Sequence, residues 1–236
     1  MVELLRLTPP ARVLDVGCGL GDEAVQLAAL AGVQVVAVDG SRVMIEEATR
    51  RAEGSGLPLT FQVADAAALP LATGSFDAGH ALTLLEHIGE PAAVVAELTR
   101  VIRPGGRLAL VDLDQGSTFV DHPDRATTRT ILNGWTDGFS GGWNGRALRR
   151  LLLQAGADDV TFELVTSEFD AGFMSYLLTP TTRRLVRDGE LSAADAEHWW
   201  AGLREFAADG RFTAAATWCL AAGTVGAGGT VGSGGT

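Results

Sequence analysis

The sequence contains no lysine, and its 18 basic residues, all of them arginine, are outnumbered by 29 acidic residues. The net charge of −11 argues against a nucleic-acid partner, because binding to phosphates requires a basic surface. The sequence has no run of about 18 consecutive apolar residues, so it predicts no membrane-spanning helix. The first residues also lack the basic start, apolar run and cleavage site of a secretory signal, and we therefore expect a cytoplasmic protein.

Cysteine and histidine are scarce as well. The two cysteines, Cys18 and Cys219, lie near opposite ends of the chain. Two cysteines are too few for a disulfide framework, so we expect reduced thiols. The four histidines show no spacing typical of metal ligands, and we expect no metal site. A chain of 236 residues with 47% hydrophobic and 20% charged residues fits one folded α/β domain.

Short β-type runs alternate with helical stretches through the first two thirds of the sequence. Strands are expected at 12–16, 33–38, 60–64, 76–82 and 107–113, and helices at 21–31, 41–53 and 91–102. This alternation implies right-handed crossovers and a mainly parallel sheet. The expected strands are apolar on both faces, as in sheets that helices cover on both sides. The pattern predicts a Rossmann-like, doubly wound α/β fold.

The last third of the sequence breaks this alternation. A long segment rich in Gly, Asp and Thr, residues 114–142, precedes a helix expected at 143–154. Two β-type runs, at 160–169 and 212–221, enclose a mainly helical insertion at 171–210. The two runs predict an antiparallel strand pair at the C-terminal edge of the sheet, and long insertions of this kind are typical of lids and binding loops.

The strongest local motif is the segment LDVGCGLGD at residues 14–22, in which a strand runs through a glycine loop into a helix. In open parallel sheets, ligands bind at the carboxyl ends of strands near the topological switch point. Gly17 and Gly19 would let the backbone turn sharply and approach such a ligand. The alternative is a tight strand–helix turn that binds nothing.

A dinucleotide fits this loop poorly. Its third glycine, Gly21, comes four positions after the first, whereas the pyrophosphate fingerprint places it five positions after. Asp22 and Glu23 open the helix, and their carboxylates would repel a pyrophosphate at the helix N-terminus. S-adenosylmethionine has no phosphate and carries a sulfonium and an ammonium group, so an acidic loop that begins at Asp15 suits it better.

Two later carboxylates support a nucleoside site. Asp39 ends the second strand, 20 positions after Gly19, where a carboxylate can accept hydrogen bonds from both ribose hydroxyls. Asp65 follows the third strand, in position to receive an adenine amino group. The alternative for Asp65 is a helix or turn cap. Together with the glycine loop, Asp39 and Asp65 mark the ends of three successive strands. Three such sites indicate a ligand more strongly than any one of them does alone.

Five segments match one known family in order and at its usual separations. They are VLDVGCGLG (13–21), VVAVDGS (35–41), ADAAALPLATGSFD (64–77), LLEHIGEP (84–91) and LTRVIRPGGRLAL (98–110). With them the chain resembles the class I S-adenosylmethionine-dependent methyltransferases, in the branch similar to the ubiquinone/menaquinone-type enzymes. The resemblance implies a seven-stranded sheet whose last two strands form an antiparallel hairpin. It also implies that the glycine loop contacts the methionine part of the cofactor, Asp39 the ribose and Asp65 the adenine.

We therefore expect S-adenosylmethionine as the cofactor, within a single domain over residues 1–224. Its core would span about 10–115, with lids at 114–142 and 171–210, followed by a disordered glycine-rich tail at 225–236. The expected cofactor contacts are Asp15, Gly17, Cys18, Gly19, Asp39, Gly40, Ser41, Asp65, Ala66 and Leu82.

The chain departs from the family in one respect. Family members usually carry helices before the first strand that help to cover the cofactor, and about eleven residues precede that strand here. The cover would then come from the two lid segments or from a partner subunit, unless the chain is shortened. The oligomeric state stays open, with a homodimer among the options.

Catalysis places modest demands on the protein, because the sulfonium methyl group is already activated. The protein must align a nucleophile and exclude water, and a general base helps when that nucleophile is a phenol, an alcohol or an acidic carbon. His87, after the fourth strand, is our candidate base, and a turn histidine is the alternative. Asp112 and Asp114 would either orient a substrate or cap their loop, and His122 would be a polar turn residue in a lid.

The predicted function is methyl transfer to an oxygen, nitrogen or carbon atom of a small-molecule acceptor. Three alternatives remain: a cyclisation or other reaction on the same fold and cofactor, a nicotinamide-dependent oxidoreduction, and a non-catalytic partner subunit. Four aromatic residues would line an aromatic pocket or pack as core, namely Trp135, Phe139, Trp143 and Phe173.

Overall fold

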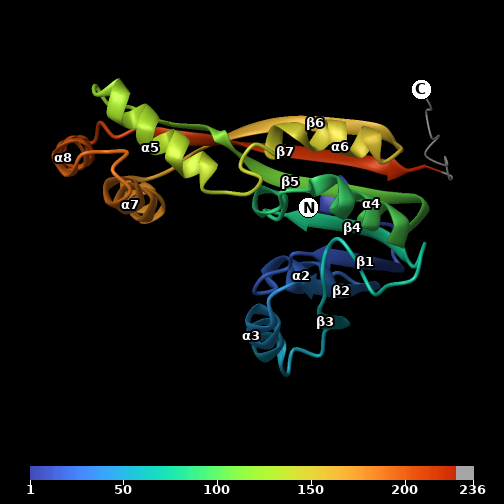
Figure 1. The fold of residues 1–236 in the computed structure, drawn as a ribbon. Helices are drawn as coiled ribbons and strands as arrows, with labels where there is room; N and C mark the ends of the chain where they lie inside the picture. The colour runs from blue at the N-terminus through green and yellow to red at the C-terminus, as the bar shows by residue number, and fades with distance from the viewer. Residues whose placement is uncertain (227–236) are drawn as a thin grey trace, which may run out of the picture.

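A single seven-stranded sheet organises residues 1–226, the part of the chain that the computed structural model describes (Figure 1). The strand order is β3-β2-β1-β4-β5-β7-β6. The strands are β1 (Ala11–Val16), β2 (Val33–Asp39), β3 (Leu59–Val63), β4 (Phe76–Leu82), β5 (Ile102–Val120), β6 (Ala157–Glu168) and β7 (Ala214–Val225). β1 to β5 run parallel, and β7 runs antiparallel to both β5 and β6. The predicted Rossmann-like α/β fold is confirmed.

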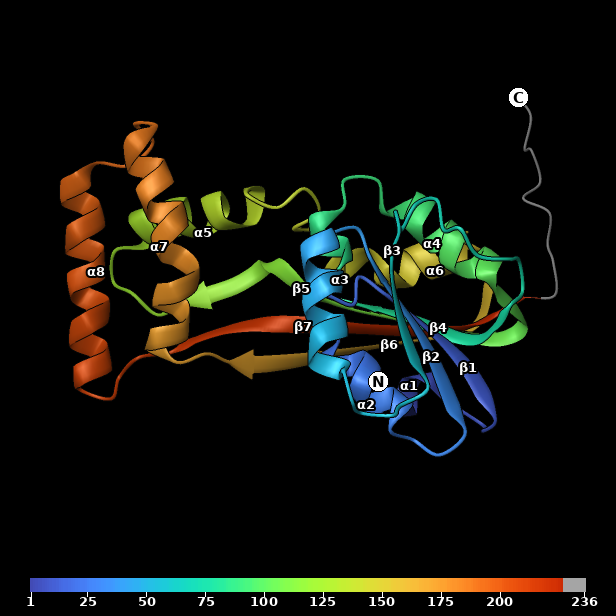
Figure 2. The same cartoon turned by 90° about the horizontal axis from the view of Figure 1, so that it is seen from below.

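Helices cover both faces of the sheet (Figures 1 and 2). The α-helices are α1 (Val2–Leu5), α2 (Asp22–Ala28), α3 (Arg42–Ala52), α4 (Pro91–Val101), α5 (Arg125–Asp137), α6 (Leu148–Gln154), α7 (Ala171–Arg187) and α8 (Ala193–Ala208). Two short 3-10 helices, η1 (Leu85–His87) and η2 (Gly145–Ala147), complete the set. Buried residues of α4 and α6 form one core with the sheet, and those of α1 and α2 form a second core.

Helix α4 illustrates how the sequence sets these layers. Pro91 occupies its first turn, where a missing N–H group costs nothing. Val94, Leu98 and Val101 recur at helical spacing, and each is at most 1% exposed. The apolar stripe therefore faces the sheet, and the chain after α4 enters β5 directly.

Strand β5 is much longer than the expected strand at 107–113. It runs to Val120, so the first seven residues of the expected lid at 114–142 belong to the sheet. The polar, glycine-containing stretch after Asp114 reads as a loop in the sequence. Pairing with β7 keeps it in the sheet, with a register shift between Asp114 and Phe119. The expected lid is therefore an extended strand followed by α5.

The long β5–β7 ribbon carries a third core beyond the end of β4. α5, α7 and α8 gather around the far end of the ribbon (Figure 1). Ile131, Leu178 and Trp199 are fully buried there. The insertion expected at 171–210 is helical, as α7 and α8. These helices stand beyond the carboxyl ends of the parallel strands, whereas α1 packs near the start of β5, where Arg107 Nε donates to the carbonyl of Leu4 (3.2 Å).

The expected C-terminal tail at 225–236 begins one residue too early. Val225 is the last residue of β7, pairs with Ala157 of β6, and is 5% exposed. Its pairing in the sheet overrides the glycine-rich composition around it. Residues 227–236 lie outside the part of the chain that the structure describes.

The helical core at the end of the ribbon can be tested by truncating one side chain. Leu178→Ala should lower the free energy of unfolding by about 2–5 kcal/mol, because a fully buried leucine leaves a cavity. Leu164→Ala is the matched control, since Leu164 on β6 is 62% exposed and should change stability by less than about 0.5 kcal/mol. Urea denaturation measures both, and equal midpoints for the two variants would contradict this packing.

Candidate active site

The glycine loop after β1 lies against the end of β2. The N–H groups of Gly17 and Cys18 both donate to the carbonyl of Val38, at 2.8 and 3.1 Å. Gly17 and Gly19 have φ angles of 75° and 51°, a region that side chains with a Cβ rarely adopt. A Cβ on Gly19 would meet no atom within 4 Å, so the loop is open on that side. The loop therefore offers accessible backbone at the carboxyl edge of the sheet, as predicted.

Asp39 fixes this loop. Its Oδ2 accepts a hydrogen bond from Gly19 N (3.0 Å) and its Oδ1 accepts one from Ser41 N (2.8 Å). Each carboxylate oxygen keeps acceptor capacity beyond one bond. The carboxylate is half-buried at the end of β2. Asp39 can therefore hold the loop and still accept bonds from a diol.

Asp15 is a buried carboxyl group among the carboxylates beside the glycine loop. Its side chain is fully buried, and burial, with the charges of Glu23 and Asp39, raises the pKa of Asp15 to about 8. His80, on the neighbouring β4, lies 3.6 Å away, and burial lowers the pKa of His80 to about 3. Because His80 is neutral, it supplies no charge, and Asp15 Oδ2 has no hydrogen-bond partner. A cationic ligand at this edge would relieve the repulsion among the carboxylates, so the residues fit a ligand that carries a sulfonium and an ammonium group.

The remaining predicted cofactor contacts lie along the same edge. Asp65 is exposed after β3, and its Oδ1 accepts a hydrogen bond from Ala67 N (2.9 Å), so it also caps its own turn. Gly40 and Ser41 follow Asp39 and are exposed, while Cys18, Ala66 and Leu82 are half-buried. Burial raises the pKa of the Cys18 thiol, which is therefore uncharged. The structure thus brings the predicted set to the ends of β1, β2, β3 and β4.

Leu84 connects this edge to the segment after β4. A Cβ built on Gly17 would lie 2.9 Å from Leu84 Cδ1, so the Leu84 side chain packs directly over the glycine loop. Two residues further on, Glu86 is 6% exposed and lies in η1. The glycine loop and Glu86 are therefore neighbours through one short segment.

A largely apolar cavity of about 340 Å³ opens beside this segment. Its lining comes from the loop after β4, from β5 and β7, and from the helical group: Thr83, Glu86, Leu113, Gln115, Thr118, Trp135, Phe139, Phe169, Phe173, Leu177 and Trp218. Of the four aromatic residues singled out in the sequence, Trp135, Phe139 and Phe173 line it. Trp143 does not, because its ring packs against Gly116 and under the Arg146 guanidinium, which lies 4.4 Å from the ring centroid.

Glu86 and its partners form a polar network at the wall of the cavity. Glu86 Oε2 accepts a hydrogen bond from Gln115 Nε2 (2.6 Å), and Gln115 Oε1 accepts one from Trp135 Nε1 (2.8 Å). Burial raises the pKa of Glu86. Sequence reasoning missed Glu86 and Gln115. In the sequence, Glu86 follows two leucines and precedes a histidine, and this position was the signal that could have identified it.

His87, the predicted base, lies beside Glu86 but is largely exposed. Its side chain is 58% exposed, its Nε2 lies 3.4 Å from Glu86 Oε1, and its ring centroid lies 5.5 Å from that of Phe139. His87 is absent from the residues that line the cavity, whereas Glu86 is among them. The structure therefore places Glu86 nearer to the cavity and leaves His87 at its outer side.

Asp112 and Asp114 support the site from β5. Asp112 Oδ2 accepts a hydrogen bond from Leu85 N (2.7 Å), and burial, with the charge of Glu86, raises the pKa of Asp112 to about 7. Asp114 is bound by Arg146 through two hydrogen bonds of 2.9 Å. Of the two roles considered for these carboxylates, the structure favours holding the loop.

Two further lid residues are structural. His122 is 7% exposed, its Nδ1 accepts a hydrogen bond from Asp124 N (3.1 Å), and its ring packs against Trp199. Met174 on α7 is 1% exposed and belongs to the third core. Both side chains are held by the packing of the helical group.

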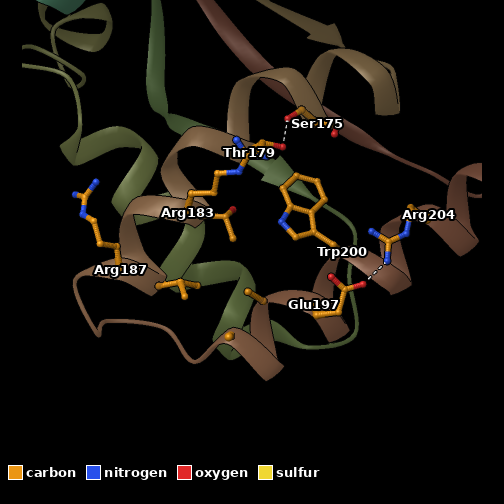
Figure 3. Close-up of a pocket in the computed structure, with 11 residues that line it drawn as sticks. Ser175, Thr179, Arg183, Arg187, Glu197, Trp200 and Arg204 are labelled. Carbon is orange, nitrogen blue, oxygen red and sulfur yellow. Dashed lines mark hydrogen bonds and ion pairs between the residues drawn. The ribbon is translucent and has the colours of Figure 1, made fainter.

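A second groove, of about 550 Å³, lies between α7 and α8 (Figure 3). Trp200 stands in its centre, with Arg183 and Arg187 on α7 and Arg204 on α8 around it. Arg204 is paired with Glu197 at 2.6 Å. The groove shares no lining residue with the aromatic cavity and none with the predicted cofactor contacts.

Within residues 1–226, no group of three or more His, Cys, Asp and Glu side chains could hold a metal ion. Among the described helices, none is both long and apolar enough to span a membrane.

Part of the chain matches a known protein family. Residues 13–106 match the family described as "Methyltransferase domain", which confirms the predicted resemblance to class I methyltransferases. The YcgJ protein of Bacillus subtilis has the same fold, with a TM-score of 0.65, 20% identity, and coverage of 97% of each chain. The ubiquinone/menaquinone branch stays a prediction.

Two curated relatives are similar in sequence. An uncharacterised 37.1 kDa protein of a Streptomyces fradiae transposon is 36% identical over 92% of this chain and 63% of its own length. An O-methyltransferase of Pyrenophora dematioidea is 39% identical over 46% of this chain and 42% of its own length. The chain therefore spans less than two thirds of either relative.

The role of Asp39 can be tested by calorimetry. Asp39→Ala should weaken binding of S-adenosylmethionine by about 1–3 kcal/mol, because the diol loses a charged acceptor and Gly19 N loses its partner. The affinity of Asp39→Asn should lie between those of the wild type and Asp39→Ala, since its single amide oxygen cannot serve both backbone donors. Asp188→Ala, an exposed aspartate on the far helical group, is the control. An unchanged dissociation constant in a correctly folded Asp39→Ala variant would remove Asp39 from the site.

Proposed function

Because residues 13–106 match the methyltransferase domain family, we propose that this chain transfers a methyl group from S-adenosylmethionine to a small-molecule acceptor. One observation carries the proposal: an open glycine loop with carboxylates at three strand ends adjoins an aromatic cavity across a single short segment. Donor and acceptor sites that are neighbours in this way allow direct transfer.

The donor would be held by the carboxyl edge of the sheet. Asp39 would accept hydrogen bonds from the ribose hydroxyls, and exposed Asp65 would receive the adenine amino group. The open backbone at Gly19 would lie along the methionine part, in the negative potential of Glu23 and Asp39. When bound, the cofactor supplies an activated methyl group, so the protein residues need only orient the acceptor and exclude water.

The acceptor would occupy the aromatic cavity. Its volume of about 340 Å³ lies at the lower end of the range for small-molecule sites, roughly 300–1,000 Å³. Trp135, Phe139 and Phe173 offer flat apolar surface, and the walls come from the ribbon and the helical group. A small apolar acceptor suits this lining better than a macromolecule would.

The cofactor assignment predicts a clear selectivity. S-adenosylmethionine and S-adenosylhomocysteine should bind in calorimetry, whereas NAD should not, because Asp22 and Glu23 at the start of α2 would repel its pyrophosphate. Mass spectrometry of reactions with an acceptor library should then show products heavier by one methyl group. Tight NAD binding without S-adenosylmethionine binding would refute the assignment. A product of unchanged mass would instead indicate a cyclisation or another rearrangement.

The acceptor cavity predicts a separation of effects. Trp135→Ala and Phe173→Ala should impair acceptor binding about tenfold or more by removing contact area, while S-adenosylmethionine affinity stays within a few-fold. Tyr176→Ala is the matched control, because Tyr176 also lies on α7 but is 77% exposed. Thermal stability, cofactor affinity and acceptor kinetics should be measured on all three variants. If the first two melt early yet turn over acceptor normally at low temperature, they only pack the helices.

A further inference from the structure

The aromatic cavity contains polar groups that an apolar ligand alone would leave unsatisfied. Among the described residues that line it, Glu86 is the one with an ionisable side chain. Thr118 Oγ1 is buried in the cavity wall and has no hydrogen-bond partner. Buried polar atoms without partners are costly, so the cavity is built for an occupant with oxygen or nitrogen atoms.

The Glu86 carboxylate is oriented by contacts from several elements. Gln115 on β5 donates to Oε2, and Gln115 is itself held by Trp135 on α5. The backbone around it is also fixed, since the carbonyl of Glu86 accepts a hydrogen bond from Gly141 N (2.9 Å). The side chain is therefore a preorganised acceptor with a fixed direction. Among the described residues, Oε1 accepts no hydrogen bond from another side chain, and His87 Nε2 lies 3.4 Å from it.

Burial raises the pKa of Glu86, whereas its hydrogen bond from Gln115 lowers it. Asp112 on β5 is a second buried carboxyl group, and its charge and that of Glu86 repel each other. The charge of His87 on η1 also lowers the pKa of Glu86. Burial is the largest effect, and it raises this pKa. A carboxylate whose pKa lies above its ordinary value accepts a proton more readily, and it does so closer to neutral pH.

The geometry points to an uncharged, largely aromatic hydroxyl compound as the acceptor, with Glu86 as the residue that orients its hydroxyl group and removes its proton. This inference rests on the proposed function and names the acceptor class and a catalytic residue for it. It shifts the role of base from His87 to Glu86, because Glu86 lines the cavity and His87 does not.

A hydroxyl group suits this site better than the other common acceptors. A carboxylic acid would bring a second negative charge next to Glu86 and Asp112. An amine would bind Glu86 as an ammonium ion, and its lone pair would then be occupied by the proton and unable to attack. A hydroxyl group donates its hydrogen to Glu86 and keeps lone pairs free on oxygen. The O-methyltransferase of Pyrenophora dematioidea agrees with this chemistry.

The reaction balances with the groups named. The acceptor oxygen forms a bond to the methyl carbon as the carbon–sulfur bond of the sulfonium donor breaks, with its electron pair left on sulfur. The hydroxyl proton passes to a carboxylate oxygen of Glu86. The products are a methyl ether, a neutral thioether and a protonated Glu86, which returns its proton to water after release.

Binding of matched probes tests the acceptor class without turnover. The probes are 2-naphthol, naphthalene, 2-naphthoate and 1-naphthylmethylamine, measured by equilibrium dialysis with S-adenosylhomocysteine present and absent. 2-Naphthol should bind about tenfold or more tightly than naphthalene, because it donates to a buried carboxylate. 2-Naphthoate should bind most weakly. Equal binding of 2-naphthol and naphthalene, or tighter binding of 2-naphthoate than of 2-naphthol, would overturn the assignment of a hydroxyl acceptor.

Glu86→Gln tests the catalytic role with little change of shape, since its amide oxygen can still accept from Gln115. The variant should lose the preference for 2-naphthol over naphthalene and bind 2-naphthoate better. Its rate of methyl transfer should fall roughly 10²–10⁴-fold, with S-adenosylhomocysteine affinity unchanged. Glu90→Gln, an exposed change in the same loop, is the matched control.

The pH profile separates Glu86 from His87. Glu86 accepts a proton only as the carboxylate, so the wild-type rate should rise with pH through a pKa above the ordinary glutamate value. This limb should vanish in Glu86→Gln and persist in His87→Gln. If His87→Gln abolishes it and Glu86→Gln does not, His87 is the base. If S-adenosylmethionine fails to bind, the proposed function falls, while the probe series still decides what the cavity recognises.

Discussion

The segment after β4 is held in place by hydrogen bonds from distant parts of the chain, and both halves of the site depend on it. Asn144 Nδ2 donates to the carbonyls of Leu85 and Ile88, each at 2.8 Å, and Asp112 accepts from Leu85 N. On one side of this segment Leu84 packs over the glycine loop, and on the other Glu86 enters the cavity wall. A shift of the segment would therefore alter the donor and acceptor sites together.

The long β5–β7 ribbon gives the cavity its second wall. β5 passes the end of β4, where Leu82 pairs with Val111, and continues to Val120. This extension carries α5 and α7 to the carboxyl edge, so their aromatic side chains face the end of β4. The helical group has a core of its own, around Trp199, whose Nε1 donates to Thr128 Oγ1 (2.8 Å). The cavity is thus framed by the ribbon and by packed helices, together with the loop after β4.

Carboxylates set the electrostatics at both ends of the site, with different physical consequences. Around the glycine loop, burial and the charges of Glu23 and Asp39 raise the pKa of Asp15, and a cationic ligand would offset this repulsion. At the cavity wall, burial raises the pKa of Glu86, and burial with the charge of Glu86 raises the pKa of Asp112, which favours taking up a proton. The same interaction therefore suits one site to binding a positive group and the other to accepting a proton.

The sequence by itself determined the features that depend on local spacing. It predicted the glycine loop, Asp39 at the end of β2 and the mainly parallel sheet, because strand and helix periods and turn chemistry are local. Tertiary structure decided the length of β5, since only β7 keeps residues after Asp114 in the sheet. It also decided that Glu86 and not His87 lines the cavity, and that Trp135 does so while Trp143 packs outside. Adjacent residues, or aromatic residues in one segment, are told apart only by what packs against them, and those partners come from β5, η2 and α7, far away in the sequence.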